Sequence, residues 1–218
     1  MATSKLKLYN GALAIVQHRS IASLTVNEEA RHALDTAYDD GAIQFCLEQG
    51  QWRFAMRTSK FSYDTGITPE FGFPRAFAKP SDWCVTSAVC SDEYFNVPHI
   101  NYTDEAGYWY SDLDDLYIKY VSNHADFGMN LSLWPASFTE YVKVYLASKV
   151  CGKLAANQQL VENITKRNGM HETALLVAKN RDAMAEPTKK LPRGNWVKAR
   201  TGSGGDWRDG GSQSNLIG

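Results

Sequence analysis

The sequence predicts an α+β protein that is mainly helical, with a four-helix core (two helices before and two after) around a β-rich antiparallel insertion. Apolar residues recur at helical spacing towards both ends of the chain, whereas aromatic and β-branched residues alternate with polar ones between Asp82 and Asp115. The expected division is a helical bundle core over residues 1–50 and 130–186, a β-rich insertion over 51–129 and an extended C-terminal arm over 187–218.

Two helices are expected before the insertion, over residues 3–18 and from about residue 25 to 47. Leu6, Tyr9, Leu13 and Val16 follow one another at spacings of three and four residues, which predicts one apolar helix face. The Thr25-Val-Asn-Glu28 segment has the spacing of a capping box, in which both side chains satisfy exposed backbone N–H groups. This pattern predicts that the second helix begins at Thr25.

The insertion is expected to begin as a helix tail that turns into a strand between residues 52 and 63. Residues 64–81 hold three of the seven prolines, which predicts a long surface loop held down by Phe71, Phe73 and Phe77. Short alternating runs over 85–89, 99–102, 108–110 and 116–121 then predict a small antiparallel meander.

Two helices are expected after the insertion. Pro135 stands where a helix can begin without losing a needed N–H donor, and the apolar spacing continues to about Cys151. A longer helix is expected over residues 154–182, with a possible kink at Gly169.

Composition and charge limit the possible functions. Of the 218 residues 44% are apolar, and the net charge of -1 argues against a protein that binds nucleic acid mainly by neutralising phosphates. Residues 187–218 carry six basic and two acidic side chains, a charge of +4, so the other 186 residues carry -5. No apolar run approaches the ~20 residues that span a bilayer, so no membrane partner is expected.

Few residues are candidates for catalysis or for binding a metal or cofactor, and none is predicted to do so. Cys84 and Cys90, followed by His99, have no common zinc-ligand spacing, so packed free thiols are the preferred interpretation. The carboxylates of the insertion are interpreted as surface turns or an acidic contact patch rather than a glycosidase pair or a metal site; they are Asp104, Glu105, Asp112, Asp114 and Asp115.

The C-terminal arm is the predicted partner-binding segment. Tryptophan and arginine are the side chains that most often anchor protein interfaces, and the arm places both in a glycine-rich stretch. The alternative is that this arm is an inert linker that binds no partner. The predicted contacts to a partner or a neighbouring subunit are Arg193, Trp196, Arg200, Trp207, Arg208, Leu216 and Ile217.

Several motifs occur in an order that resembles a known family. They are LYNGAL at 8–13, CLEQGQWRFAMR at 46–57, KPSDW at 79–83, YWY at 108–110, YVSN at 120–123, LWPASF at 133–138 and KNRDAMAE at 179–186. Together they resemble tail tubular protein A, the head-to-tail adaptor family of short-tailed bacteriophages, over nearly the whole chain to about residue 200.

The resemblance implies a virion component at the head-to-tail interface that is not an enzyme, is assembled in the host cytoplasm and needs no cofactor. Twelve copies are expected to form a ring beneath the portal protein and to join it to a nozzle protein resembling tail tubular protein B. DNA would pass through the lumen without sequence-specific binding, while arms reach along the portal and neighbouring subunits. Two alternatives remain open: a nucleic-acid-binding module that uses the basic arm, or a cysteine hydrolase.

Overall fold

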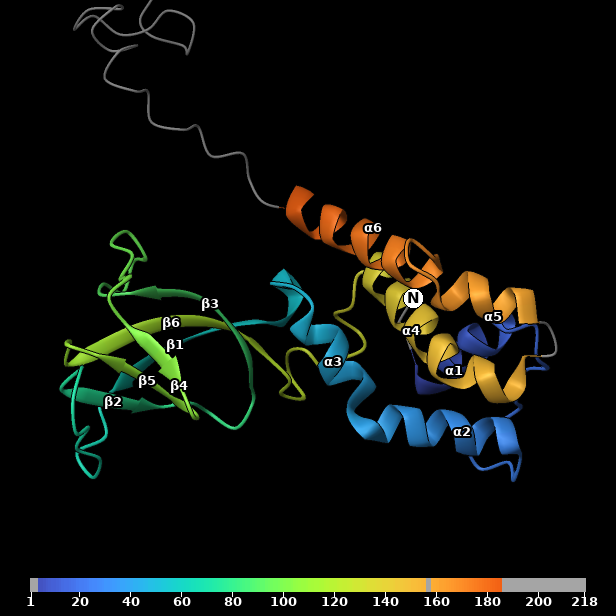
Figure 1. Ribbon diagram of the computed structural model, residues 1–218, viewed down its shortest axis with the longest axis horizontal. Helices are drawn as coiled ribbons and strands as arrows, with labels where there is room; N and C mark the ends of the chain where they lie inside the picture. The colour runs from blue at the N-terminus through green and yellow to red at the C-terminus, as the bar shows by residue number, and fades with distance from the viewer. Residues whose placement is uncertain (1–3, 156–157, 186–218) are drawn as a thin grey trace, which may run out of the picture. The chain divides into compact units, whose positions relative to one another are not determined.

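Helices and strands occupy separate stretches of the chain, as expected for an α+β protein. The computed structural model describes residues 4–155 and 158–185 (Figure 1). Within these residues the α-helices lie before residue 49 and after residue 135, and the strands lie between residues 56 and 122. We call residues 4–50 and 130–185 the helical region and residues 51–129 the β region.

The helices before the insertion are α1 (Lys5–Ile15), α2 (Glu29–Ala37) and α3 (Ile43–Glu48). The hydroxyl of Ser4 caps α1 by accepting a hydrogen bond from the backbone N–H of Lys7 at 3.3 Å. The predicted capping box at Thr25 is wrong: α2 begins at Glu29, and its N-cap residue is Glu28, which makes no side-chain cap. Thr25 lies three residues before this position, and its hydroxyl is hydrogen-bonded to that of Ser23.

The helix expected up to residue 47 is divided in two. A π-helical turn over Tyr38–Ala42 separates α2 from α3, and inside it Gly41 has a φ of +87°. A residue with a side chain rarely adopts this left-handed conformation, so the glycine permits the change of direction between the two helices.

The helices after the insertion are α4 (Ala136–Leu154), α5 (Gln158–Thr165) and α6 (Met170–Met184). The helix expected over 154–182 is therefore broken rather than kinked, at the predicted Gly169. A Cβ atom at this glycine would lie 2.7 Å from the carbonyl oxygens of Asn163 and Lys166, so no larger residue fits the turn. In Figure 1, α6 runs alongside α4, and the two helices pack against each other.

The strands of the described chain form two three-stranded antiparallel sheets, ordered β1-β6-β3 and β2-β5-β4. Their bounds are β1 (Met56–Ser62), β2 (Arg75–Ala78), β3 (Trp83–Cys90), β4 (Thr103–Glu105), β5 (Tyr108–Ser111) and β6 (Asp115–Ser122). The turn into a strand near residue 56 is confirmed, because a 3₁₀ turn over Arg53–Ala55 leads directly into β1.

The predicted meander is wrong in its strand order. β3 pairs with β6 rather than with the next strand, because Leu116, Ile118 and Tyr120 of β6 are buried and make it the central strand of its sheet. Residues 99–102 form no strand, whereas β2 lies inside the predicted 64–81 loop. The four residues of β2 begin just after Pro74, so its short apolar run is hidden among turn residues.

Two apolar clusters form the interior of the described chain. The larger one fills the helical region and includes Trp52, Ala55, Cys84 and Val121 from the β region. The smaller one lies within the β region and consists of Phe77, Val89, Trp109, Leu116, Ile118 and Tyr120. The chain on both sides of the insertion is thus anchored in the helical core, and described residues up to Met184 belong to one compact unit. The domain boundaries at 50 and 130 remain a prediction.

Candidate interaction surfaces

The predicted partner-binding residues, from Arg193 to Ile217, lie outside the described residues. Two other surfaces of the described chain combine exposed apolar side chains with unpaired charges. The first is at one end of the β region and the second is on α6.

Three loops emerge at the same end of both sheets. The register pairs Ser62 with Asp115, Cys90 with Tyr117 and Arg75 with Ser111, so each of these strand ends leads into a loop at this end. We call the loops over residues 63–74, 91–102 and 112–114 the acidic tip (Figure 1).

The acidic tip exposes large apolar side chains to solvent. Phe71 and Ile100 are each 88% exposed, Tyr94 is 75% exposed and Val97 is 55% exposed. The expectation that Phe71 holds the loop against the surface is wrong, because only Phe77 of the three phenylalanines is fully buried. Phe71 lies among glycine and proline residues and gave no periodic signal, whereas Ile100 lies in the 99–102 run that was predicted to be a strand, so the sequence did not identify these residues as a surface.

The shape of the 91–102 loop is fixed by Asp92. Its carboxylate accepts hydrogen bonds from the backbone N–H groups of Asn96 at 3.0 Å and Val97 at 2.8 Å. The bonds from Val97 and Asn96 lower the pKa of Asp92 below its ordinary value, because they stabilise the ionised form. The loop is therefore ordered by its own backbone rather than by burying its apolar side chains.

The acidic tip is strongly negative. Its three loops contain six carboxylates and no lysine or arginine: Asp64, Glu70, Asp92, Glu93, Asp112 and Asp114. The whole β region has eleven acidic and six basic residues, a charge of -5, so the negative charge of the body is concentrated here. Glu70 and Glu105 also line a groove between the 63–74 loop and strands β4 and β5, together with Phe71, Phe73 and Tyr110.

The five carboxylates singled out in the sequence are divided between two roles. Asp112 and Asp114 belong to the acidic tip, where Asp114 pairs with Arg75 at 2.6 Å. Asp115 bonds Lys60 at 2.8 Å and the Ser62 hydroxyl at 2.6 Å, and these two bonds lower its pKa. Asp104 pairs with Lys79, whose ammonium group lies 3.6 Å from the centre of the Trp83 ring. The Asp115–Lys60 pair joins the neighbouring strands β6 and β1, and the Asp104–Lys79 pair joins β4 to the end of β2, so both are structural contacts.

The second surface is the outward side of α6, which we call the α6 face. It exposes Leu176 (60%), Val177 (56%) and Met184 (75%), while Ala178 on the opposite side is buried. Lys179 lies one turn beyond Leu176, and Arg181 lies between Val177 and Met184 at helical spacing. Apolar residues on a solvent-exposed side of a helix are typical of a contact surface.

Beside its apolar residues the α6 face carries two basic side chains, whereas the two acids of α6 keep their charge but are hydrogen-bonded to backbone N–H groups within the chain. Glu172 accepts a hydrogen bond from the backbone of Asn168 at 2.7 Å, and Asp182 accepts one from the backbone of Arg53 at 3.1 Å. Lys179 and Arg181 are exposed and form no ion pair with residues 4–155 or 158–185. The two acids of the helix are therefore engaged within the chain, whereas its two bases are available to a partner.

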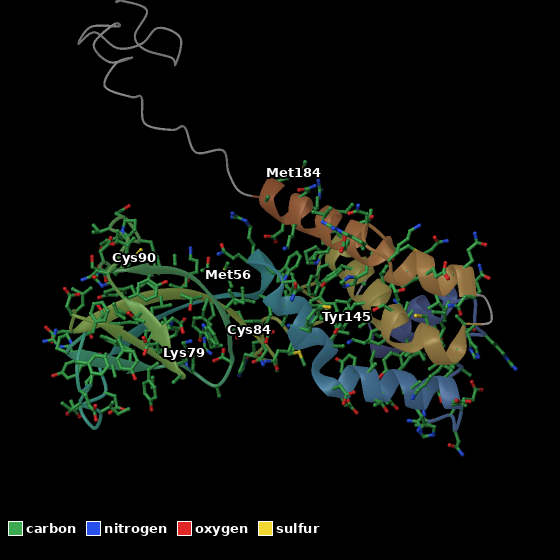
Figure 2. The ribbon with its side chains drawn as sticks, viewed as in Figure 1. Met56, Lys79, Cys84, Cys90, Tyr145 and Met184 are labelled. Carbon is green, nitrogen blue, oxygen red and sulfur yellow. The ribbon has the colours of Figure 1, made fainter. Side chains whose placement is uncertain are left out.

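All four cysteines are buried, free thiols. Burial raises the pKa of Cys46 to about 12 and that of Cys84 to about 11, and it also raises the pKa of Cys90 and Cys151. Figure 2 shows Cys84 and Cys90 at opposite ends of β3, so they do not share a site. A raised thiol pKa leaves little thiolate at neutral pH, which favours packing over a nucleophilic role.

The described ranges hold neither a group of metal ligands nor a membrane-spanning helix. In residues 4–155 and 158–185, no three His, Cys, Asp or Glu side chains are grouped closely enough to hold a metal ion. No described helix is both long enough and apolar enough to cross a membrane.

Comparison of the sequence with models of protein families and with curated proteins gave no match.

Proposed function

We propose that this protein is a structural head-to-tail adaptor of a short-tailed phage, similar to tail tubular protein A. Twelve copies form a ring under the portal protein, join it to the tail nozzle protein and leave a channel through which DNA leaves the head. The protein transforms no substrate, and its place is the virion.

One observation carries this proposal: the motifs that resemble the family supply residues which hold the elements of this fold together. LYNGAL supplies buried residues of α1, and Trp52 and Trp109 are 1% and 0% exposed. LWPASF supplies Trp134 and Phe138, whose rings meet at 5.0 Å at the start of α4. Motifs that recur in order and fill structural positions support a shared fold more strongly than isolated surface matches do.

We also assign the four helices of the expected core. α1 is the first, α2 with α3 is the second, α4 is the third, and α5 with α6 is the fourth. Contacts of α4 with α1, α2 and α6 support this assignment, because they make α4 the central helix of the group.

The acidic tip and the α6 face support a protein that works in a complex rather than as a free monomer. Their large apolar side chains gain little from contact with water, and burying them against another protein is favourable. Neither the acidic tip nor the buried thiols provide the activated nucleophile that a hydrolase needs.

Deletion of residues 187–218 tests the proposal. Pull-down with purified portal protein should fail for the truncated chain, while its thermal unfolding stays unchanged. Trp207→Ala should weaken portal association by about 2 kcal/mol, the scale of an interface anchor. Unchanged portal association of the deletion variant would remove the assignment of the arm.

The +4 charge of residues 187–218 favours nucleic-acid binding as the second candidate. Binding of fluorescent DNA to the full chain and the truncated chain, measured at two salt concentrations, separates the two functions. An adaptor predicts weak DNA binding that the deletion leaves unchanged. Tight, salt-sensitive DNA binding that disappears with the arm would favour the second candidate.

A further inference from the structure

The acidic tip and the α6 face are complementary to each other, although both belong to the same chain. From this complementarity we infer that the acidic tip of one copy docks on the α6 face of the next copy. The inference rests on the proposed ring and names the surfaces through which neighbouring copies meet.

The charges of the two surfaces are opposite. The acidic tip has six carboxylates and no lysine or arginine, and Glu70 and Glu93 are exposed and form no ion pair within residues 4–155 and 158–185. The α6 face offers Lys179 and Arg181 in the same unpaired state. Opposite charges steer two surfaces together and oppose contacts between like surfaces, so tip-to-tip and α6-to-α6 pairing are disfavoured.

The apolar side chains of the two surfaces provide the favourable burial. The acidic tip presents Phe71, Tyr94 and Ile100, and the α6 face presents Leu176 and Val177. Aromatic side chains surrounded by a charged rim are typical of the centre of a protein interface. Each surface thus contains both an apolar centre and a charge that the other surface can neutralise.

The contact joins two different surfaces and is therefore heterologous. After one tip has docked, each copy still has one free surface, so a further copy can be added at either end. Contacts of this kind form a closed ring when the rotation between copies returns to its start. A two-fold dimer would bury both surfaces at once and would stop the assembly.

Charge reversal on the full-length chain tests the contact. Variant A carries Glu70→Lys and Glu93→Lys, and variant B carries Lys179→Glu and Arg181→Glu. Variant A changes the charge of the tip from -6 to -2 and replaces two unpaired carboxylates by lysines, so that basic groups face Lys179 and Arg181. In variant B carboxylates face carboxylates. Each variant alone should therefore lose the attraction between its own copies. Mixed in equal amounts, A and B should associate in alternation. The reversed positions of the A tip then meet the reversed positions of the B α6 face, and the unchanged tip of B meets the unchanged α6 face of A.

Association is measured with engineered cysteines, since the four natural thiols are buried. Copies with Ile100→Cys are mixed with copies with Val177→Cys and treated with a short bis-maleimide at high protein concentration. The yield of linked pairs should fall about tenfold or more when both partners carry variant A or both carry variant B, and it should recover in the A–B mixture. Copies with Ser20→Cys in place of Val177→Cys provide the background yield.

The matched control is Glu29→Lys with Asp126→Lys, which changes the charge by the same amount outside both surfaces. It should leave the yield unchanged. Two results would overturn the inference. One is a yield for Ile100→Cys with Val177→Cys, without charge reversal, that is no higher than the yield with Ser20→Cys. The other is a yield that does not recover in the A–B mixture.

Portal pull-down distinguishes this result from a failure of the proposed function. Variants A and B keep residues 187–218 and should each still bind portal. If crosslinking follows the expected pattern but the wild-type chain does not bind portal, the contact between copies stands and the adaptor assignment fails.

Discussion

The helical region is stabilised by a large apolar core, whereas the β region combines a small core with charged groups that bond neighbouring strands. In the helical core the Trp52 ring lies 4.9 Å from that of Phe138 and 6.3 Å from that of Tyr141. In the β region, all of it described, one cluster has six buried apolar side chains, and Asp82 is buried beside it.

In both regions, the residues that stabilise the fold are therefore different from the residues that are free to contact another protein. Because the β region needs few apolar side chains for its own core, residues such as Phe71 and Ile100 remain exposed at its end. The helical region buries most of its large apolar residues and exposes them mainly on α6. We therefore expect changes in the two cores to affect folding, and changes at the acidic tip to affect association.

The largest effect is expected for Trp52→Ala. Trp52 is 1% exposed, and its indole N–H donates a hydrogen bond to the carbonyl oxygen of Cys46 at 3.0 Å. Loss of this ring should lower the free energy of unfolding by about 4 kcal/mol, measured by denaturant titration. Because Trp52 belongs to the helical core but precedes β1, backbone amides of both regions should lose protection from hydrogen exchange.

Trp109→Ala is the matched variant in the small core. The Trp109 ring packs against Phe61 at 5.3 Å, and its N–H bonds the Thr86 hydroxyl at 3.1 Å, so these contacts stay within the β region. Its loss should reduce amide protection mainly in residues 51–129. Equal loss of protection in α1 and α4 would contradict the separation of the two cores.

A smaller effect is expected for Asp82→Asn. The carboxylate of Asp82 bonds the Ser122 hydroxyl and lies 2.9 Å from the guanidinium of Arg57. Burial opposes ionisation of Asp82, but the hydrogen bonds from Ser122 and Arg57 outweigh it and hold its pKa below the ordinary value. The substitution should cost about 2 kcal/mol at neutral pH.

The pH dependence of Asp82 follows from the direction of this shift. A carboxyl with a lowered pKa stabilises the fold above its unfolded pKa of about 4, and this contribution is lost as the pH falls through the folded pKa. The difference in unfolding free energy between wild type and Asp82→Asn should therefore shrink below pH ~4. Asp126→Asn, at an exposed site, is the control and should show no such difference.

The attachment of α6 is expected to depend weakly on pH through His171. Its ring lies 5.5 Å from those of Tyr141 and Tyr145 on α4, and its Nε2 atom is buried without a hydrogen-bond partner among the described residues. Burial lowers the pKa of His171; nearby Lys149 adds to this shift, and Glu172 opposes it.

A lowered histidine pKa means that the neutral form stabilises the fold. This contribution is complete above the unfolded pKa of about 6.5 and is lost as the pH falls through the folded pKa. His171→Leu should change the free energy of unfolding at neutral pH by at most about 1 kcal/mol and should remove this part of its pH dependence. Urea titrations of wild type and His171→Leu from neutral to acidic pH measure the change at neutral pH and the pH dependence. Identical pH profiles for the two proteins would contradict a role of His171 in this pH dependence.

The sequence predicted the mixed helical and strand character well because helical spacing and alternation are local signals. It did not predict the order of the strands, because the pairing of β3 with β6 depends on contacts between residues such as Val89 and Ile118 that lie far apart in the chain. The helix start at Glu29 was also missed, because the capping-box spacing at Thr25 is a local pattern and the N-cap residue in the structure is Glu28. The acidic tip was found only in part: of its six carboxylates only Asp112 and Asp114 were singled out, and Ile100 was assigned to a strand over 99–102 rather than to an exposed loop.

The smallest effect on folding is expected at the acidic tip, from Phe71→Ser combined with Ile100→Ser. Both side chains are 88% exposed, so removing them takes little buried area from the fold and should change the free energy of unfolding by less than about 0.5 kcal/mol. A loss as large as that for Trp52→Ala would mean that these residues pack inside the protein in solution. Unchanged stability together with weaker association of copies that carry no engineered cysteine, measured by sedimentation at high protein concentration, would assign their apolar surface to association. Exposed aromatic and aliphatic groups are retained at a cost in solubility unless a partner covers them.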